Sequence, residues 1–335
     1  MPIDLAVLIP PRTDIAPPGA FVVAAIPGFP QHLVGRDDHG RACILVASTD
    51  SGIRHPVRLG GLAVQYALRC TVRLNGLAEE RVLSVATSTN DTSESERYFL
   101  HVMATLVEIV GQSPPLAELA EAITQLAEIF QRLSGASRES VIGIIGELLV
   151  ISCASNPIAA AQAWRADPDE RYDFAHGNLR LEVKSSSNRR RVHEFSLEQT
   201  DVPAGCKGVV ASVFVEKSSG GFTLQDLLQL LGTVLMASPS ALLRVQQTLA
   251  WTLGSELPSA LPFAFDYNLA ISQLSLFDLD LVPAIRRPIP GEVSRVRFTS
   301  DLEKMSPIDP VALVTECSDY AAFAPAGQPD LGWSP

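Results

Sequence analysis

Asp173, Glu182 and Lys184 are three side chains whose types and spacing could together act on a phosphate group. Over residues 179–184 apolar side chains alternate with charged ones, a pattern typical of a β-strand with one buried face. In such a strand Glu182 and Lys184 project from the same face. The His-Gly-Asn at 176–178 is typical of a hairpin turn, so pairing across it would bring the carboxylates of Asp173 and Glu182 close together.

Two neighbouring carboxylates repel each other, and a divalent cation between them removes the conflict. Oxygen ligands from Asp and Glu suit Mg²⁺ better than zinc, and Mn²⁺ can take its place. A lysine beside them could orient water and stabilise the charge that develops on a phosphate. Metal-assisted hydrolysis of a phosphodiester uses these parts. The alternative interpretation is a solvated strand face with an incidental Glu–Lys pair.

A third acid, Glu147, is the only charged residue in the apolar segment 140–155, which we expect to be helical. An unpaired carboxylate in such a helix is costly, so Glu147 needs a partner, a proton or a metal ion. Gly143 and Gly146 would let this helix approach a sheet closely. The alternative is a glutamate at a polar edge of the helix.

The elements that must position these side chains fall into four segments of the chain. They are a β-rich N-terminal domain (1–112), a helical connector (113–137), a core that carries the site (138–240) and a C-terminal α/β extension (241–335). The patterns in the first two segments predict a hairpin over 33–46, strands at 62–74 and 81–87, and helices at 97–111 and 116–134.

The core segment is predicted to follow the order helix, three strands, helix, strand, helix. The expected elements are a helix at 138–154, strands at 171–176, 179–186 and 190–195, a helix from about Ser196, a strand at 208–216 and a helix at 223–237. The fold class is therefore mixed α/β.

This core resembles the PD-(D/E)XK superfamily of restriction-endonuclease-like nucleases, and most closely the bacterial branch called PD-(D/E)XK motif proteins. The matching segments are 146–149 (Gly-Glu-Leu-Leu), Trp164, 172–174 (Tyr-Asp-Phe), 182–185 (Glu-Val-Lys-Ser) and 193–199. The αβββαβ order of that superfamily agrees with the predicted elements, and the match covers about 138–237.

The resemblance implies roles for the residues at these positions. Asp173 and Glu182 would hold Mg²⁺ with Glu147 assisting from the helix, and Lys184 would be the catalytic lysine. The literal Pro-Asp pair is Pro168-Asp169, but we prefer Asp173 because it is expected opposite Glu182. Gln199 fits a capping box with Ser196, or it could act beside the site. His193 is either a strand residue near the groove or a base.

A local basic surface accompanies the predicted site. Residues 180–191 hold five basic residues against one acidic residue. Arg189, Arg190 and Arg191, with Ser185 before them, could bind DNA phosphates, although a solvated basic loop is an equal alternative.

Composition limits the class of protein. The chain has 335 residues, 47% of them hydrophobic and 19% charged, with a formal net charge of −11. That charge disfavours a protein that coats nucleic acid by bulk attraction. Five widely spaced cysteines and the absence of a signal peptide or long apolar run predict a cytoplasmic protein outside the membrane.

Two functions from different classes fit these features. The first, implied by the resemblance, is an Mg²⁺-dependent DNA endonuclease, the cleaving component of a bacterial restriction or phage-defence system. Methyltransferase or ATPase components would be its partners, and a homodimer would suit double-strand cleavage. The second is a catalytically weak or inactive scaffold that binds DNA or partner subunits in such a complex.

Overall fold

The computed structural model describes residues 3–14, 16–52, 54–90, 92–132, 140–165 and 169–325. The chain divides into two compact units, one formed by residues 1–137 and 249–259 and the other by 138–248 and 260–335. Residues 113–137, predicted as a connector, thus fall in the first unit. The larger part of the predicted C-terminal extension falls in the second.

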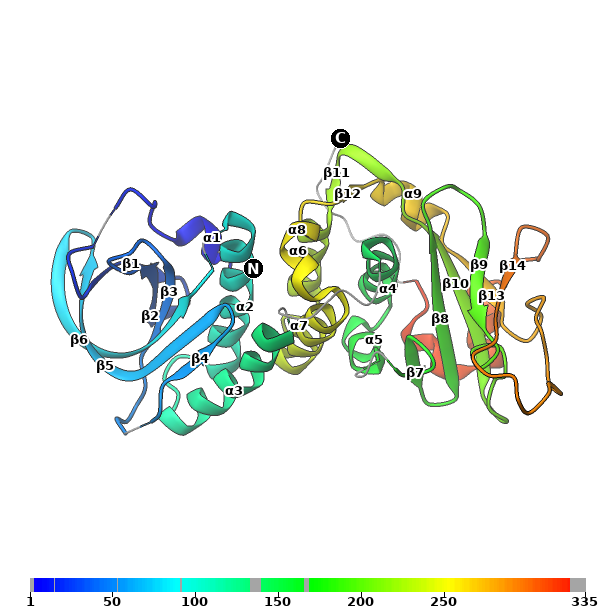
Figure 1. Ribbon diagram of the computed structural model, residues 1–335, viewed down its shortest axis with the longest axis horizontal. Helices are drawn as coiled ribbons and strands as arrows, with labels where there is room; N and C mark the ends of the chain where they lie inside the picture. Colours follow the sequence, from blue (N-terminus) through cyan, green and yellow to red (C-terminus); the bar gives the residue numbers. More distant parts are fainter. Residues whose placement is uncertain are drawn as a thin grey trace. The chain divides into compact units, whose positions relative to one another are not determined.

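The first unit is built on a six-stranded sheet of order β1-β2-β3-β6-β5-β4, in which β1 also pairs with β5 (Figure 1). Its strands are β1 (Ala20–Ile26), β2 (Phe29–Arg36), β3 (Ala42–Val46), β4 (Val57–Leu59), β5 (Leu62–Leu74) and β6 (Leu77–Ser88). Over residues 3–132 its helices are α1 (Leu5–Leu8), α2 (Ser93–Val110) and α3 (Leu116–Arg132).

The β-rich unit closed by a helix agrees with the sequence prediction. The predicted hairpin is β2–β3, with Arg36 opposite Ala42, and the predicted strand at 62–74 is β5. Helix α2 begins where the Thr92 hydroxyl accepts a hydrogen bond from the backbone N–H of Ser95, and it ends at Gly111, which has a φ of 68°. The predicted end of the next helix, at 133–134, lies outside the described residues.

The second unit contains a four-stranded sheet of order β13-β10-β8-β7. Strands β7 and β8 form an antiparallel hairpin, β8 and β10 are parallel, and β10 and β13 are antiparallel. The core strands and helices are α4 (Val141–Cys153), α5 (Pro157–Ala163), β7 (Phe174–His176), β8 (Leu179–Ser186), β9 (Val192–Ser196), β10 (Lys207–Phe214), β11 (Lys217–Thr223) and α6 (Leu224–Val234).

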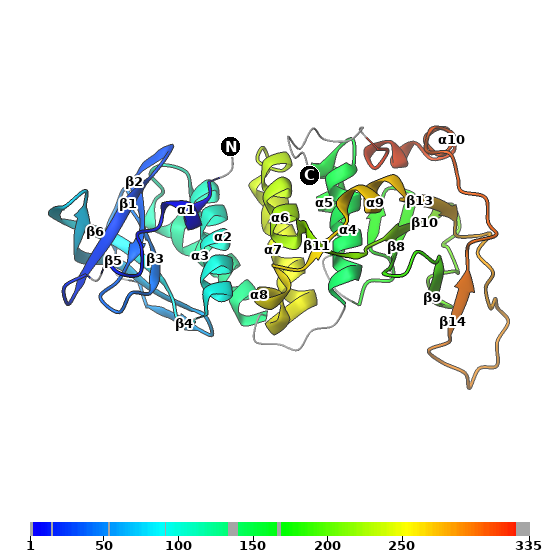
Figure 2. The ribbon, with the colours of Figure 1, turned by 90° about the horizontal axis from the view of Figure 1, so that it is seen from above.

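The remaining elements follow the core in sequence. They are α7 (Pro239–Leu253), η1 (Gly254–Glu256), α8 (Leu257–Ala260), β12 (Ala264–Phe265), α9 (Tyr267–Ser272), β13 (Ser275–Asp278), β14 (Arg297–Asp301), α10 (Pro310–Glu316) and η2 (Ser318–Ala322). Strand β14 pairs with β9 in a separate two-stranded ribbon. Figures 1 and 2 show α4 on one side of β8 and β10, and the β9–β14 ribbon on the other.

Helix α4 approaches β8 closely because it carries a glycine at the contact. A Cβ atom on Gly146 would collide with the Ser185 hydroxyl. The hairpin turn before β8 also needs a glycine, since Gly177 has a φ of +50°. These two glycines fix where the helix and the hairpin place their acidic side chains.

The helix predicted from about Ser196 is wrong. Residues 197–200 form a turn, and β10 begins at Lys207. The capping hydrogen bonds between Ser196 and Gln199 do form. However, Pro203 follows within one further turn, and a proline disfavours helical backbone at the residue before it, so the helix is not continued.

Within the described residues, no helix has the length and apolar character needed to cross a bilayer.

Candidate active site

The β7–β8 hairpin brings Asp173 next to Glu182, as the spacing predicts. Phe174 pairs with Leu181, and Asp173 comes one residue before this pair. The Asp173 Oδ2 atom accepts a hydrogen bond of 2.7 Å from the backbone N–H of Val183. Asp173 is 7% exposed and Glu182 is 3% exposed, so both carboxyl groups are held in the interior by the strand pairing.

The sequence alternatives for the first acid are separated by this geometry. Asp169 is exposed and lies in a turn, whereas Asp173 is buried beside β8. Pro168, its neighbour in the literal Pro-Asp pair, lies outside the described residues. Asp173 is therefore the acid that the fold places with Glu182.

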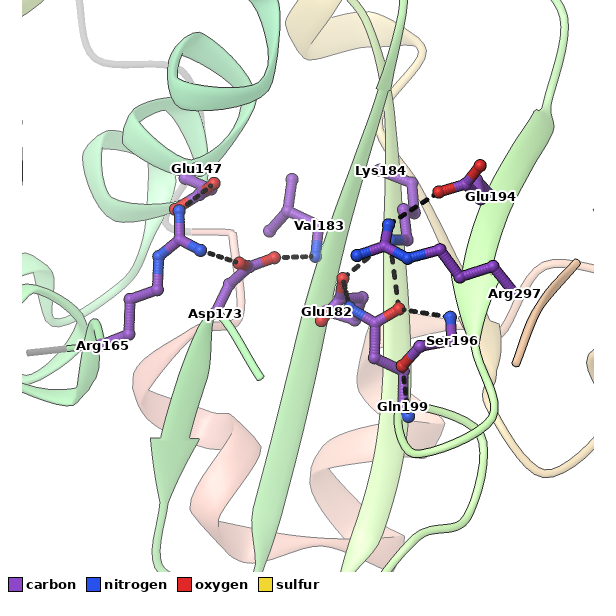
Figure 3. A network of polar contacts seen from close by, with 10 residues as sticks. All are labelled: Glu147, Arg165, Asp173, Glu182, Val183, Lys184, Glu194, Ser196, Gln199 and Arg297. Atoms are coloured by element: carbon purple, nitrogen blue, oxygen red, sulfur yellow. Dashed lines mark hydrogen bonds and ion pairs between the residues drawn. The ribbon is translucent and has the colours of Figure 1, made fainter. Parts of the chain in front are cut away.

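Lys184 and Gln199 complete a hydrogen-bonded group around Glu182 (Figure 3). The Lys184 Nζ atom lies 2.8 Å from Glu182 Oε1, and Gln199 donates from Nε2 to the same oxygen at 2.5 Å. Lys184 also donates to Gln199 Oε1 at 3.4 Å. That amide oxygen accepts the Ser196 backbone N–H at 3.0 Å, so Gln199 makes the predicted cap and also contacts Glu182.

Glu147 does not join this group. Its Oε2 atom accepts a hydrogen bond of 2.6 Å from Trp164 Nε1, and Arg165 donates to its two oxygens at 3.1 and 3.2 Å. Figure 3 shows Glu147 and Arg165 on one side, Glu182 on the other, and Asp173 between them. The side chains of β8 alternate between its two faces, and α4 packs against the face opposite to Glu182.

The prediction that three acids converge on one ion is therefore not reproduced. Among the described residues, no three His, Cys, Asp or Glu side chains are grouped so that they could hold a metal ion. The physical reason is that an indole N–H and a guanidinium already satisfy the carboxylate of Glu147. Glu147 was therefore wrongly included among the predicted metal ligands.

Arg165 links Glu147 to Asp173. Its NH1 atom lies 3.4 Å from Asp173 Oδ1, and its backbone N–H donates to the Asp173 carbonyl oxygen at 2.9 Å. Arg165 is 5% exposed. Arg165 was not among the predicted site residues, because the only signal in the sequence was that Glu147 needed a partner, and spacing along the chain does not identify that partner.

The electrostatics of Glu182 favour a cation at this position. Burial and, as a smaller effect, the neighbouring Asp173 raise the pKa of Glu182, and Lys184 opposes them, so that the net pKa is about 8. Its Oε2 atom is buried and has no hydrogen-bond partner among the described residues. Two close carboxylates with one unsatisfied oxygen are a suitable donor set for a hard divalent cation. Asp173 and Glu182 fit Mg²⁺ or Mn²⁺, whereas Glu147 does not.

The predicted phosphate-binding arginines divide into exposed and buried side chains. Arg189 is exposed and donates to both oxygens of Glu216, at 2.7 and 2.9 Å, and Arg190 is exposed. Arg191, in contrast, is 8% exposed. Its guanidinium donates to Ser212 O and Oγ, Gln273 O and Ser275 Oγ.

The prediction that Arg191 binds DNA is therefore wrong. Arg191 comes just before β9, which pairs with β14, and the Arg191 carbonyl accepts the backbone N–H of Leu302 at 2.8 Å. This pairing, more than 100 residues away in sequence, turns the side chain into the interior. Its guanidinium lies over Phe214, 4.4 Å from the ring centroid.

His193 and Ser185 occupy structural positions in the same unit. His193 Nε2 lies 2.8 Å from Ser212 Oγ, and burial, with smaller effects from Lys184 and Arg191, lowers its pKa to about 4. Ser185 faces Gly146 of α4. Its hydroxyl is buried and has no hydrogen-bond partner within the described part of the chain. Ser185 therefore lies on the α4 side of β8, away from Glu182, whereas His193 lies near Lys184 but has its hydrogen bond with Ser212.

Comparison with known proteins identified one family model. It is described as "Putative PD-(D/E)XK family member" (DUF4420), and it matches residues 27–303. The match spans both compact units and includes Glu147, Asp173, Glu182 and Lys184. Neither the curated proteins nor the solved structures gave a significant match.

Proposed function

Because the chain belongs to the PD-(D/E)XK family DUF4420, whose fold is nuclease-like, we propose that it is an Mg²⁺-dependent DNA endonuclease. The observation that carries this proposal is the buried pair Asp173 and Glu182 with Lys184 Nζ 2.8 Å from Glu182. Nucleases of this superfamily generally use divalent metals, and the unsatisfied Glu182 Oε2 atom is suited to bind one.

Each residue has a separate role in this proposal. Asp173 and Glu182 would hold the cation. When bound, the cation supplies electrophilic stabilisation of the scissile phosphate and a lowered pKa for water. Lys184, 18% exposed, would donate a hydrogen bond to the attacking water or to a non-bridging phosphate oxygen. Gln199 fixes Lys184 and Glu182 relative to each other through both ends of its amide.

The reaction is a hydrolysis. The water oxygen forms a bond to phosphorus, the bond from phosphorus to the leaving sugar oxygen breaks, and that oxygen takes up a proton while the water loses one. The products would be a 5′-phosphate and a 3′-hydroxyl, as in the superfamily that the chain resembles. Arg189 and Arg190, which are exposed, would contact DNA phosphates beside the site.

The wider role follows from the family resemblance. The protein would be the cytoplasmic cleaving component of a restriction or phage-defence system, acting with methyltransferase or ATPase components. One such centre cuts one strand, so a homodimer would suit double-strand cleavage.

A scaffold subunit that binds DNA or partner proteins is the second candidate. The small exposed fractions of Asp173 and Glu182 favour it, because a substrate must reach them. The retained Asp173, Glu182 and Lys184 oppose it, since a degenerate site would be free to lose a buried repelling pair.

Cleavage of plasmid DNA tests the proposal. The full chain is incubated with supercoiled plasmid in Mg²⁺, in Mn²⁺ and in EDTA, with the variants Asp173→Asn and Lys184→Met. Asp169→Asn is the matched control, because that acid is exposed and lies four residues from Asp173. We expect metal-dependent nicking that both site variants lose and the control retains.

Two results would oppose the endonuclease. Equal nicking by all variants would show that another protein or another site is responsible. Metal-independent DNA binding without cleavage in wild type would favour the scaffold.

A further inference from the structure

We propose that Arg165 takes the place of a second metal ion, so that the site holds a single divalent cation. This inference rests on the proposed function and specifies its metal stoichiometry. The key observation is that one buried guanidinium bridges two carboxylates, Glu147 on α4 and Asp173 before β7.

The contacts of Arg165 are those that a cation between two acids would make. Its guanidinium lies 3.1 and 3.2 Å from the Glu147 oxygens and 3.4 Å from Asp173 Oδ1. In two-metal sites, neighbouring ions are about 3.5–4 Å apart, close enough for one carboxylate to contact both. Here Asp173 is the shared carboxylate, with Arg165 on the side of Glu147 and Glu182 on the other (Figure 3).

The charges around Asp173 lead to the same stoichiometry. With all three carboxylates ionised, as cation binding requires, they face two fixed cations, Arg165 and Lys184, which leaves at most one net negative charge among these buried or half-buried groups. One divalent cation already reverses that charge. A second one would have to displace a guanidinium that is bonded to both acids and covered from solvent.

Trp164 holds Glu147 in this arrangement. Its indole N–H donates to Glu147 Oε2 at 2.6 Å, and its ring is 1% exposed. Glu147 is therefore directed at Arg165 by a rigid, buried donor. Glu147 and Arg165 are therefore positioning residues that act on the site through Asp173.

The count of bound Mn²⁺ tests this inference directly. Electron paramagnetic resonance of free Mn²⁺ gives the number of ions bound per full-length chain at saturation, without requiring cleavage. We expect one ion in the wild-type protein. Arg165→Ala removes the guanidinium and leaves room at Glu147 and Asp173, so we expect two ions. Arg165→Lys retains a positive charge there and should keep the count at one.

Two further variants control for the loss of a buried guanidinium. Glu147→Gln combined with Arg165→Ala removes the carboxylate that would bind a second ion together with Asp173. It also removes the buried negative charge that Arg165→Ala alone leaves at Glu147 without its guanidinium. The number of bound ions should therefore return to one. Arg191→Ala removes a buried guanidinium whose partners are carbonyl and hydroxyl groups, and the count should remain one. If Arg165→Ala does not fold, Arg165→Gln repeats the test with a larger neutral side chain, and it should also bind two ions.

The outcomes separate this inference from the proposed function. Two ions in wild type, or one ion in folded Arg165→Ala, would overturn the role of Arg165 while leaving a metal-dependent enzyme. Two ions in the double variant would also overturn it, because Glu147 would not be the additional ligand. No ion bound by the wild-type protein would contradict both proposals.

Discussion

Replacing Glu182 by Gln should stabilise the metal-free protein while removing the effect of metal on its stability. The pKa of Glu182 is raised from 4.5 to about 8. Ionisation of Glu182 therefore favours the unfolded state. The resulting loss in the free energy of unfolding is absent below pH 4.5, grows as the pH rises and is complete above pH 8. At pH 7 this difference corresponds to ~3 kcal/mol. The amide introduced by Glu182→Gln would carry no charge, and its oxygen can still accept from Gln199.

Urea unfolding in EDTA at pH 5, 7 and 8.5 measures this effect as the difference between wild type and Glu182→Gln. We expect the variant's advantage to be small at pH 5, about 3 kcal/mol at pH 7 and larger at pH 8.5. Mg²⁺ should stabilise the wild type and not the variant. Glu198→Gln, an exposed acid in the neighbouring turn, should change little. An advantage that stays constant or shrinks as the pH rises would refute the reasoning.

Three further substitutions test the surrounding structure. His193→Gln should make the free energy of unfolding less sensitive to acid. The pKa of His193 is about 4 in the folded protein and 6.5 in the unfolded chain, so the wild type should lose about 2 kcal/mol of stability between pH 7.5 and pH 5. Urea unfolding at each pH measures this loss. An equal loss in the variant would contradict a buried neutral imidazole. Gly146→Ala should cost about 1–3 kcal/mol, because its Cβ collides with Ser185 Oγ, and an unchanged melting temperature would be inconsistent with the close α4–β8 packing. Arg191→Ala should lower the free energy of unfolding by about 3 kcal/mol, because it leaves buried acceptors without a donor. The DNA affinity of the folded variant, measured by fluorescence anisotropy, should be unchanged. A loss of DNA affinity in folded Arg191→Ala would show that Arg191 contributes to DNA binding.

The local part of the candidate site could be predicted from the sequence. Alternation over 179–184 and the turn at 176–178 determine the β7–β8 hairpin, and that hairpin alone puts Asp173 beside Glu182. Likewise, an isolated acid in an apolar helix predicts that Glu147 needs a partner. These inferences use only neighbours in sequence, so they depend little on the rest of the fold.

The parts that failed depend on contacts between distant segments. The sequence pattern places Arg191 in a basic loop, but β9 pairs with β14, and this pairing buries its side chain. Whether Glu147 binds a metal or a guanidinium depends on where the segment after α5 places Arg165. The hydrophobic periodicity of the sequence does not predict that position. The capping pattern at Ser196 was real, but Pro203 limits the segment to a turn.

The position of a bound ion tests the central claim most directly. A crystal of the full chain grown with Mn²⁺ gives the ion's place from its anomalous scattering. We predict one peak, between the carboxylates of Asp173 and Glu182 and on the side of Lys184. A peak at Glu147 with Arg165 displaced, or no peak near Asp173 and Glu182 at saturating Mn²⁺, would contradict the account.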